Sequence, residues 1–114
     1  MKVNVDRKNG VTVLRPHGKM DDGGTSVLEQ SIYKTLSNSD NAPKMLIDFD
    51  DVARVRNTGL MMLKQALMAI KRKGGRIGVI NVGSHVKNPI VIINVVRDFE
   101  RFGSEKEALS ALAS

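Results

Sequence analysis

The side chains best suited to chemistry are a group of carboxylates and two histidines. Asp48, Asp50 and Asp51 stand close together in the chain, and carboxylate oxygens can hold a divalent cation. Their spacing lacks the central glycine and the distal glutamate of a calcium-binding loop. His17 and His85 are isolated and lack the paired spacing of a zinc site. We therefore expect no metal at these positions.

The sequence does not offer the parts of a catalytic site. It contains no cysteine, which excludes thiol catalysis and cysteine zinc sites. No nucleophile, base and orienting group can be assembled from its residues. The glycine pairs at 23–24 and 74–75 lack the spacing of a phosphate-binding loop. We expect a protein that is not an enzyme and that needs no cofactor.

Basic residues are concentrated in one part of the chain. The segment from Val52 to Arg97 holds nine basic residues and no acidic one, whereas the remainder holds nine basic and twelve acidic residues. This asymmetry predicts either an electropositive surface for an acidic partner or a solvated face without further role. Nucleic acid is a less favoured partner, because the chain has three Phe, one Tyr and no recognised reader motif.

Length and composition indicate one ordinary globular domain. The chain has 114 residues, of which 41% are hydrophobic and 26% charged. No run approaches the roughly 20 apolar residues that cross a bilayer, and the N-terminal residues lack the apolar block of a signal peptide. We expect a single domain over residues 1–114 that is cytoplasmic and does not insert into a membrane.

Turn signals and alternation predict the first elements. Asn9 and Gly10 separate two strand-like segments, one around residues 3–5 and one over 11–14, and this pair of residues favours a hairpin. Pro16 and Gly18 either end the second strand or bend it into a short extension through Met20. Ser26 and Glu29 have capping-box spacing, which predicts that a helix begins with Ser26 as its N-cap.

The middle of the chain predicts a buried strand and a long helix. The nearly continuous apolar run Met45–Phe49 is typical of a strand that is covered on both faces. A loop over Asp50–Arg56 follows, and then a helix with Asn57 as N-cap. We expect this helix to end at Gly74.

The last third predicts alternating strands and helices. We expect a strand over 76–82, a helix that begins at Ser84 or Asn88, and a short strand within 99–102. Ser104 caps a final helix through a second capping box. The fold class is therefore α/β, with a mixed β-sheet and helices packed on it.

Several stretches resemble one known family. Residues 45–60 resemble the central strand, loop and helix start of STAS domains, and residues 13–21 resemble the family's early strand, glycine and aspartate. Residues 74–80 resemble its next strand, and residues 84–109 its C-terminal end. The resemblance implies a STAS fold of the bacterial anti-sigma-factor-antagonist type.

The resemblance also implies a function by partner switching. Antagonists of this type bind an anti-sigma factor, often a serine kinase or a related kinase-fold protein, and thereby release a sigma factor. Phosphorylation of the first serine in a motif of aspartate, serine, serine or threonine, glycine and leucine abolishes this binding. A phosphate adds roughly −1.5 to −2 charge at a helix start.

The chain departs from that motif at the switch itself. Asn57 occupies the phosphoserine position and cannot be phosphorylated there, and Arg56 replaces the aspartate. Only Thr58, Gly59 and Leu60 keep the pattern. Asn57 is either a plain helix cap or the equivalent of an unphosphorylated serine, which would leave the protein permanently able to bind. Thr58 is a candidate substitute acceptor.

The candidate partner-binding residues surround this junction. They are Asp21, Arg54, Arg56, Asn57, Thr58, Gly59, Met61, Lys64 and Met68. Arg54 and Arg56 would point the same way in an extended segment and could pair with carboxylates, or they are solvated loop residues. Met61 and Met68 are seven residues apart. Packing at the edge of the core is the favoured interpretation, and an adaptable contact surface is the alternative.

Two other functions remain open at this point. The chain could be a STAS subunit of a larger sensor or transport-associated assembly, in which Arg56 and Asn57 belong to a lasting interface. A basic nucleic-acid-binding domain is the third hypothesis. The sequence does not name the partner, the sigma factor or the upstream signal.

Overall fold

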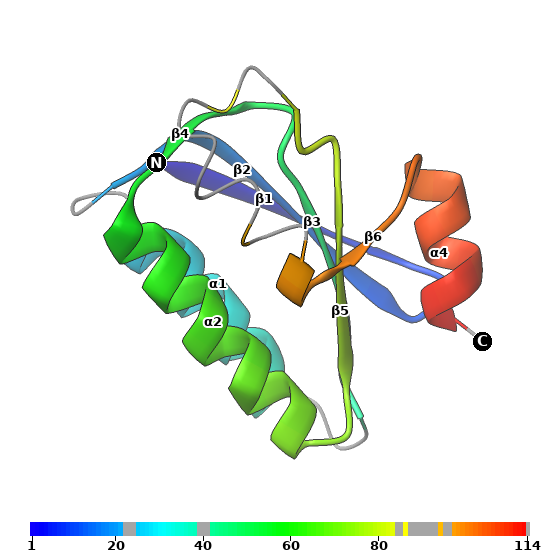
Figure 1. The fold of residues 1–114 in the computed structure, drawn as a ribbon. Coiled ribbons are helices and arrows are strands. Elements are labelled where there is room, and N and C mark those ends of the chain that lie inside the picture. The colour runs from blue at the N-terminus through cyan, green and yellow to red at the C-terminus, as the bar shows by residue number, and fades with distance from the viewer. Residues whose placement is uncertain (22–24, 39–41, 84–85, 87–93, 95–96, 114) are drawn as a thin grey trace.

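An antiparallel hairpin forms one edge of the sheet (Figure 1). The computed structural model describes residues 1–21, 25–38, 42–83, 86, 94 and 97–113. Strand β1 spans Lys2–Lys8 and β2 spans Val11–Met20. Asn9 and Gly10 join them at φ values of 55° and 78°, the positive values that a two-residue hairpin turn requires. The predicted hairpin is confirmed.

The other strands run parallel to β2 and complete a six-stranded mixed sheet. They are β3 (Lys44–Asp48), β4 (Val52–Val55), β5 (Arg76–Ile80) and β6 (Glu100–Arg101). The main strand order is β1-β2-β3-β5-β6, and β4 pairs with the end of β2. The predicted mixed α/β fold is confirmed.

Strand β4 corrects one sequence prediction. It lies inside the segment Asp50–Arg56, for which we expected a loop. Val52 pairs with Gly18 and Val55 with Met20, so the partner strand comes from far away in the sequence. A four-residue strand with an irregular burial pattern has no local alternation by which the sequence could reveal it.

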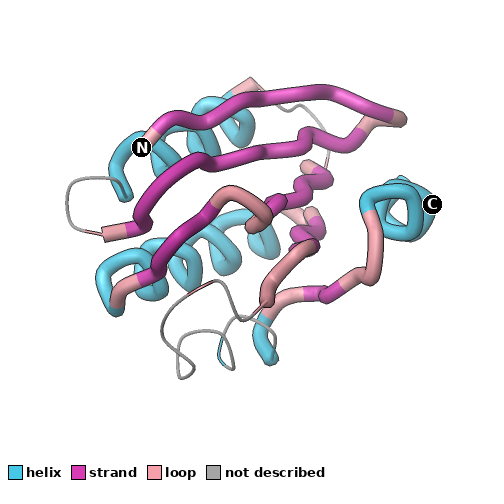
Figure 2. Tube along the Cα trace, turned by 90° about the horizontal axis from the view of Figure 1, so that it is seen from above, coloured by secondary structure: helices cyan, strands magenta, loops and turns pink. Residues whose placement is uncertain are grey.

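Helices cover both faces of the sheet. They are α1 (Thr25–Ser37), α2 (Asn57–Arg72) and α4 (Glu105–Ala113). Helices α1 and α2 lie together on one face, and in Figure 2 the C-terminal helix stands apart from this pair. Met45 and Ile47 of β3 belong to the core under α1 and α2, whereas Leu46 packs with Ala108 and Leu112 of α4. The prediction that Met45–Phe49 is covered on both faces is confirmed for these positions.

Two predicted helix ends are confirmed, the start of α4 and the end of α2, and the predicted start of α1 is not. The N–H of Glu107 donates to the Ser104 hydroxyl at 3.1 Å, as the second capping box predicts. Helix α2 ends at Arg72, with Gly74 at a φ of 73°. The predicted cap at Ser26 is wrong. Helix α1 already begins at Thr25, because the N–H and hydroxyl of Thr25 both donate to the carbonyl of Asp21.

Part of the C-terminal third lies outside the described residues. The two expected starts of a helix, at Ser84 and Asn88, both fall there. The short strand expected within 99–102 is confirmed by β6. Among the helices that the structure describes, none combines the length and the apolar character needed to cross a membrane.

Candidate functional site

The junction between β4 and α2 differs from the prediction in its cap. Helix α2 has Arg56 as N-cap, with φ −97° and ψ 173°, and the Arg56 side chain makes no capping hydrogen bond. Asn57 is the first residue inside the helix, so the predicted cap at Asn57 is wrong. The main chain of Arg56 is extended by its continuity with β4, and this places the start of the helix one residue earlier than the residue preferences favour.

Main-chain contacts hold this junction against the end of β2. The N–H of Arg56 donates to the carbonyl of Met20 at 2.9 Å, and the N–H of Leu60 donates to the carbonyl of Arg56 at 3.0 Å. A Cβ atom on Gly59 would lie 2.8 Å from the Met20 oxygen and 3.1 Å from its Cβ. Only glycine therefore allows the first turn of α2 to pack this closely. Gly59 itself is buried, which makes it a residue that positions the turn.

Four residues of α2 form an outward-facing row that we call the α2 outer stripe. They are Asn57, Met61, Lys64 and Met68. Their spacing of four, three and four residues places them on one side of the helix. The buried side is formed by Leu60, Leu63, Ala66 and Ile70.

The methionines of this stripe are exposed. Met61 keeps 61% and Met68 55% of their accessible surface. The favoured interpretation of packing at the core edge is therefore wrong for both residues. The buried side of α2 is filled instead by residues that include Met62 and Ala66, which the sequence analysis did not single out. A flexible, polarisable thioether on an open helix face suits contact with another surface.

Charged residues flank the stripe unevenly. Arg56 is exposed at the start of the helix. Arg54 is turned toward Asp21, with 3.4 Å between its Nη2 and the Asp21 Oδ2, and its Nε is buried without a hydrogen-bond partner among the described residues. The two arginines therefore do not form a matched exposed pair. Lys64 lies 3.7 Å from a carboxylate oxygen of Asp98.

Thr58, the candidate substitute acceptor, also lies at the surface. Thr58 is exposed and follows Asn57 in the first turn of α2. Around a helix start, the aligned peptide dipoles favour negative charge. The first turn of α2 contains no acidic residue. This end of the helix is therefore strongly positive, with Arg56 adding to the field of the helix itself.

The carboxylates of Asp48, Asp50 and Asp51 do not converge on one point. Asp48 pairs with Arg15 at 3.0 Å and accepts a hydrogen bond from Asn81. Asp51 lies 2.8 Å from Nδ1 of His17. Within the described part of the chain, no three acidic or histidine side chains are grouped to hold a metal ion.

A cluster of ion pairs on the α4 face was not found by sequence reasoning. Arg15 contacts Asp6, Asp48 and Glu105, and Lys8 also pairs with Glu105 at 3.0 Å. Partial burial opposes ionisation of Glu105, but hydrogen bonds from Lys8 and Arg15 outweigh it and hold the pKa of Glu105 below its ordinary value. The cluster ties the hairpin and β3 to the start of α4. Its members are too far apart in sequence to have given a signal.

Comparisons with known proteins agree on the fold. A family model described as STAS domain matches residues 2–108. No curated protein matches the sequence significantly.

Solved structures share this architecture over nearly the whole chain. An anti-sigma factor antagonist from Mycobacterium paratuberculosis is 24% identical, with a TM-score of 0.81 over 99% of this chain and 94% of that one. A proposed anti-sigma factor antagonist from Thermotoga maritima is 16% identical, with a TM-score of 0.84 over 98% and 95%. A murine solute carrier 26 family anion transporter is 18% identical, with a TM-score of 0.71 over 90% of this chain and 18% of the transporter.

Proposed function

Because this chain belongs to the STAS domain family, whose model matches residues 2–108, we propose that it is a non-catalytic docking protein of the anti-sigma-factor-antagonist kind. Its partner would be an anti-sigma factor or a related kinase-fold protein in the cytoplasm. One observation carries the proposal. The α2 outer stripe presents two exposed methionines in line with Asn57, at the helix start where the family's motif lies.

The chemistry of this surface supports a protein partner. Met61 and Met68 are two turns apart and supply apolar contact area, while the exposed Arg56 adds positive charge at the start of the helix. Interfaces commonly combine an apolar centre with a polar rim, and both methionine and arginine are enriched in them. The positive start of α2 favours an acidic patch on the partner.

We propose further that phosphorylation at position 57 does not switch this docking. Asn57 is exposed and carries a neutral amide where the family resemblance places a phosphorylatable serine. The protein would then bind its partner without prior dephosphorylation. Thr58, which is also exposed in the first turn, is the alternative acceptor.

Affinity capture tests the docking proposal. Purified wild type, Asn57→Glu and the control Val27→Lys would be used as baits in native lysate, with captured proteins identified by mass spectrometry. We expect the wild type and Val27→Lys to capture an anti-sigma factor, and Asn57→Glu to lose it, because the new charge lies on the α2 outer stripe. Val27 is an exposed apolar residue of α1, so its substitution controls for a new charge elsewhere. Equal capture by all three baits would contradict the proposal.

Phosphate mapping tests the switch. The captured kinase-fold partner is incubated with ATP and either the wild type or Asn57→Ser. We expect phosphate on Ser in the variant and no stoichiometric phosphate on the wild type. Stoichiometric phosphate on Thr58 of the wild type would contradict constitutive binding and would indicate a phosphorylation switch at this neighbouring residue.

A second candidate function comes from the transporter comparison. The murine anion transporter has a region of the same fold within a much longer chain. In that case Arg56 and Asn57 would belong to a lasting interface within a larger assembly. Capture of a transport or sensor component in place of an anti-sigma factor, with loss of that component on Asn57→Glu, would favour this alternative.

Nucleic acid is the least favoured partner. Several cations of the basic segment are already engaged in ion pairs, namely Arg54, Lys64, Arg76 and Arg97. Binding driven by phosphate contacts depends on cations that can pair with the nucleic acid backbone.

A further inference from the structure

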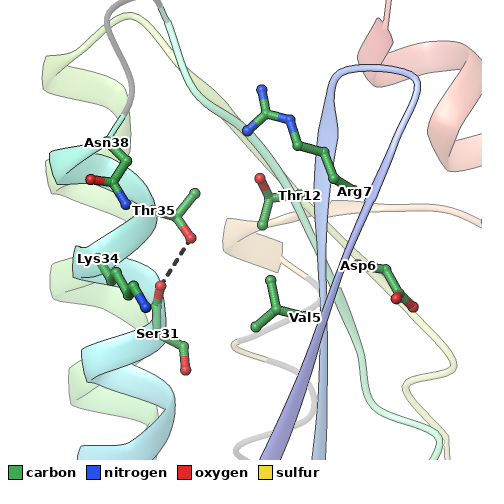
Figure 3. A pocket seen from close by; sticks show the side chains of 8 residues that line it. All are labelled: Val5, Asp6, Arg7, Thr12, Ser31, Lys34, Thr35 and Asn38. Atoms are coloured by element: carbon green, nitrogen blue, oxygen red, sulfur yellow. Dashed lines mark hydrogen bonds between the residues drawn. The ribbon is translucent and has the colours of Figure 1, made fainter.

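A partly open pocket, lined by both polar and apolar surface, lies between α1 and the hairpin of β1 and β2 (Figure 3). Its volume is about 340 Å³, at the lower end of the range for small-molecule pockets. The second half of α1 forms one wall, and the facing strands form the other. The α2 outer stripe is not part of its lining, so the cavity is separate from the proposed docking surface.

Thr12 is the most unusual residue of the lining. It is 5% exposed and is the one polar residue among the buried side chains that the structure describes. Its neighbours Val11 and Val13 are buried and apolar, as a strand covered on both faces favours. No hydrogen bond joins the Thr12 hydroxyl to any described residue. Among the described residues, the one buried side-chain polar atom without a hydrogen-bond partner is Nε of Arg54, so the Thr12 hydroxyl is accessible from the pocket that it lines and can hydrogen-bond to a ligand there.

Two cations give the cavity a positive field. Arg7 enters the lining from β1 and Lys34 from α1, and neither forms an ion pair within the described ranges. The single carboxylate of the lining, Asp6, pairs with Arg15 at 3.2 Å and points away from α1 in Figure 3. A small anion in the cavity would therefore meet two positive groups and no opposing free carboxylate.

The α1 wall supplies further hydrogen-bonding groups. The Ser31 hydroxyl donates to the carbonyl of Val27 at 3.1 Å, so its oxygen keeps lone pairs that can accept a hydrogen bond. Thr35 donates in the same way to the carbonyl of Ser31, as the dashed line in Figure 3 marks. Asn38 adds an amide that both donates and accepts. These groups suit a ligand that carries hydroxyls.

We propose that this cavity binds a small organic oxyanion with hydroxyl groups, of the kind found in sugar phosphates and hydroxycarboxylates. The oxyanion pairs with Arg7 and Lys34. The ligand hydroxyls exchange hydrogen bonds with Thr12, Ser31 and Asn38. The inference goes beyond the proposed docking function and does not depend on it.

Titration of the ¹⁵N-labelled chain at constant ionic strength tests the proposal. The probes are ribose 5-phosphate, citrate, ribose and inorganic phosphate. We expect saturable chemical-shift changes of the backbone amides in residues 5–12 and 31–38 with ribose 5-phosphate or citrate. The ligand that binds more tightly shows whether the pocket prefers a phosphate or a carboxylate group. Ribose should give no shifts, and inorganic phosphate should bind more weakly. The absence of saturable shifts with both organic anions would overturn the proposal, as would equal binding of inorganic phosphate.

Variants separate a built site from general charge attraction. Arg7→Ala with Lys34→Ala should lower the affinity about tenfold or more, since two charge-assisted hydrogen bonds are lost. The matched control is Arg101→Ala with Lys106→Ala, which removes the same charge from exposed positions on β6 and α4. An equal loss in the control would overturn the proposal.

Thr12→Val removes the hydroxyl and keeps the shape of the side chain. We expect it to weaken binding while leaving the urea midpoint unchanged or higher, because the hydroxyl has no described protein partner. A clearly lower urea midpoint together with unchanged affinity would mean that Thr12 serves the fold alone, which would also overturn the proposal.

Discussion

Gly59 lies so close to Met20 that no other residue fits at its position. A Cβ atom built on Gly59 would lie 2.8 Å from the carbonyl oxygen of Met20, which is closer than real Cβ atoms come to other atoms. The clash would involve backbone, which cannot move aside as a flexible side chain can. The start of α2 is therefore fixed relative to the end of β2.

Gly59→Ala should destabilise the protein by about 1–3 kcal/mol, the usual cost of overpacking a close contact. Urea unfolding would measure the change. Gly103→Ala is the control, because its Cβ would meet only the carboxylate of Glu107 at 3.1 Å, the far end of a flexible side chain. An equal effect of the two substitutions would contradict the role given to Gly59.

Arg56→Ser should stabilise the protein by about 1 kcal/mol. The serine hydroxyl can cap the start of α2, and the positive charge is removed from the positive end of the helix. The same substitution at the other end, Arg72→Ser, should instead cost about 0.3–1 kcal/mol, since a cation is favourable there. Urea unfolding of both variants checks the opposite signs. Changes of the same sign would mean that Arg56 has a stabilising contact of its own.

In the double variant Met61→Lys, Met68→Lys, each substitution should change the free energy of unfolding by no more than about 0.5 kcal/mol. Both side chains are exposed, so little burial is lost. Affinity for the captured partner should fall strongly, as measured by calorimetric titration. Unchanged affinity would exclude the α2 outer stripe from the interface.

Acid should weaken the attachment of α4 through Glu105. The pKa of Glu105 is lower in the folded protein than the ordinary value of 4.5, so its ion pairs stabilise the fold above that pH. This stabilisation is lost as the pH falls through the folded pKa. Between pH 7 and pH 3, Glu105→Gln should therefore lose less unfolding free energy than the wild type. Glu29→Gln, on α1 and outside the cluster, is the control. Identical losses in the wild type and Glu105→Gln would contradict this assignment.

Most of the architecture could be predicted from local patterns. The turn at Asn9 and Gly10, the apolar run at residues 45–49 and the cap at Ser104 each depend on residues close in sequence. Strand β4 could not be predicted, because its hydrogen bonds go to β2, more than thirty residues earlier. Its existence depends on tertiary pairing rather than on the preferences of its four residues.

The geometry around the start of α2 differs from the sequence prediction in two respects. Sequence reasoning identified the residues around the start of α2, yet assigned the cap to Asn57 and the methionines to the core edge. Asparagine is the better cap, but the chain leaving β4 fixes the helix start at Arg56. Met61 and Met62 are adjacent in sequence, and only the rotation of the helix buries one and exposes the other.

The entry into α2 is built from main-chain hydrogen bonds and from the missing side chain of one glycine. The Arg56 side chain makes no capping hydrogen bond there, and both Arg56 and Asn57 are exposed. Substitutions at these two positions can therefore change the charge and hydrogen-bonding groups of the surface while the main-chain construction stays the same. Within a lineage, recognition at this corner is able to diverge while the scaffold beneath it stays the same.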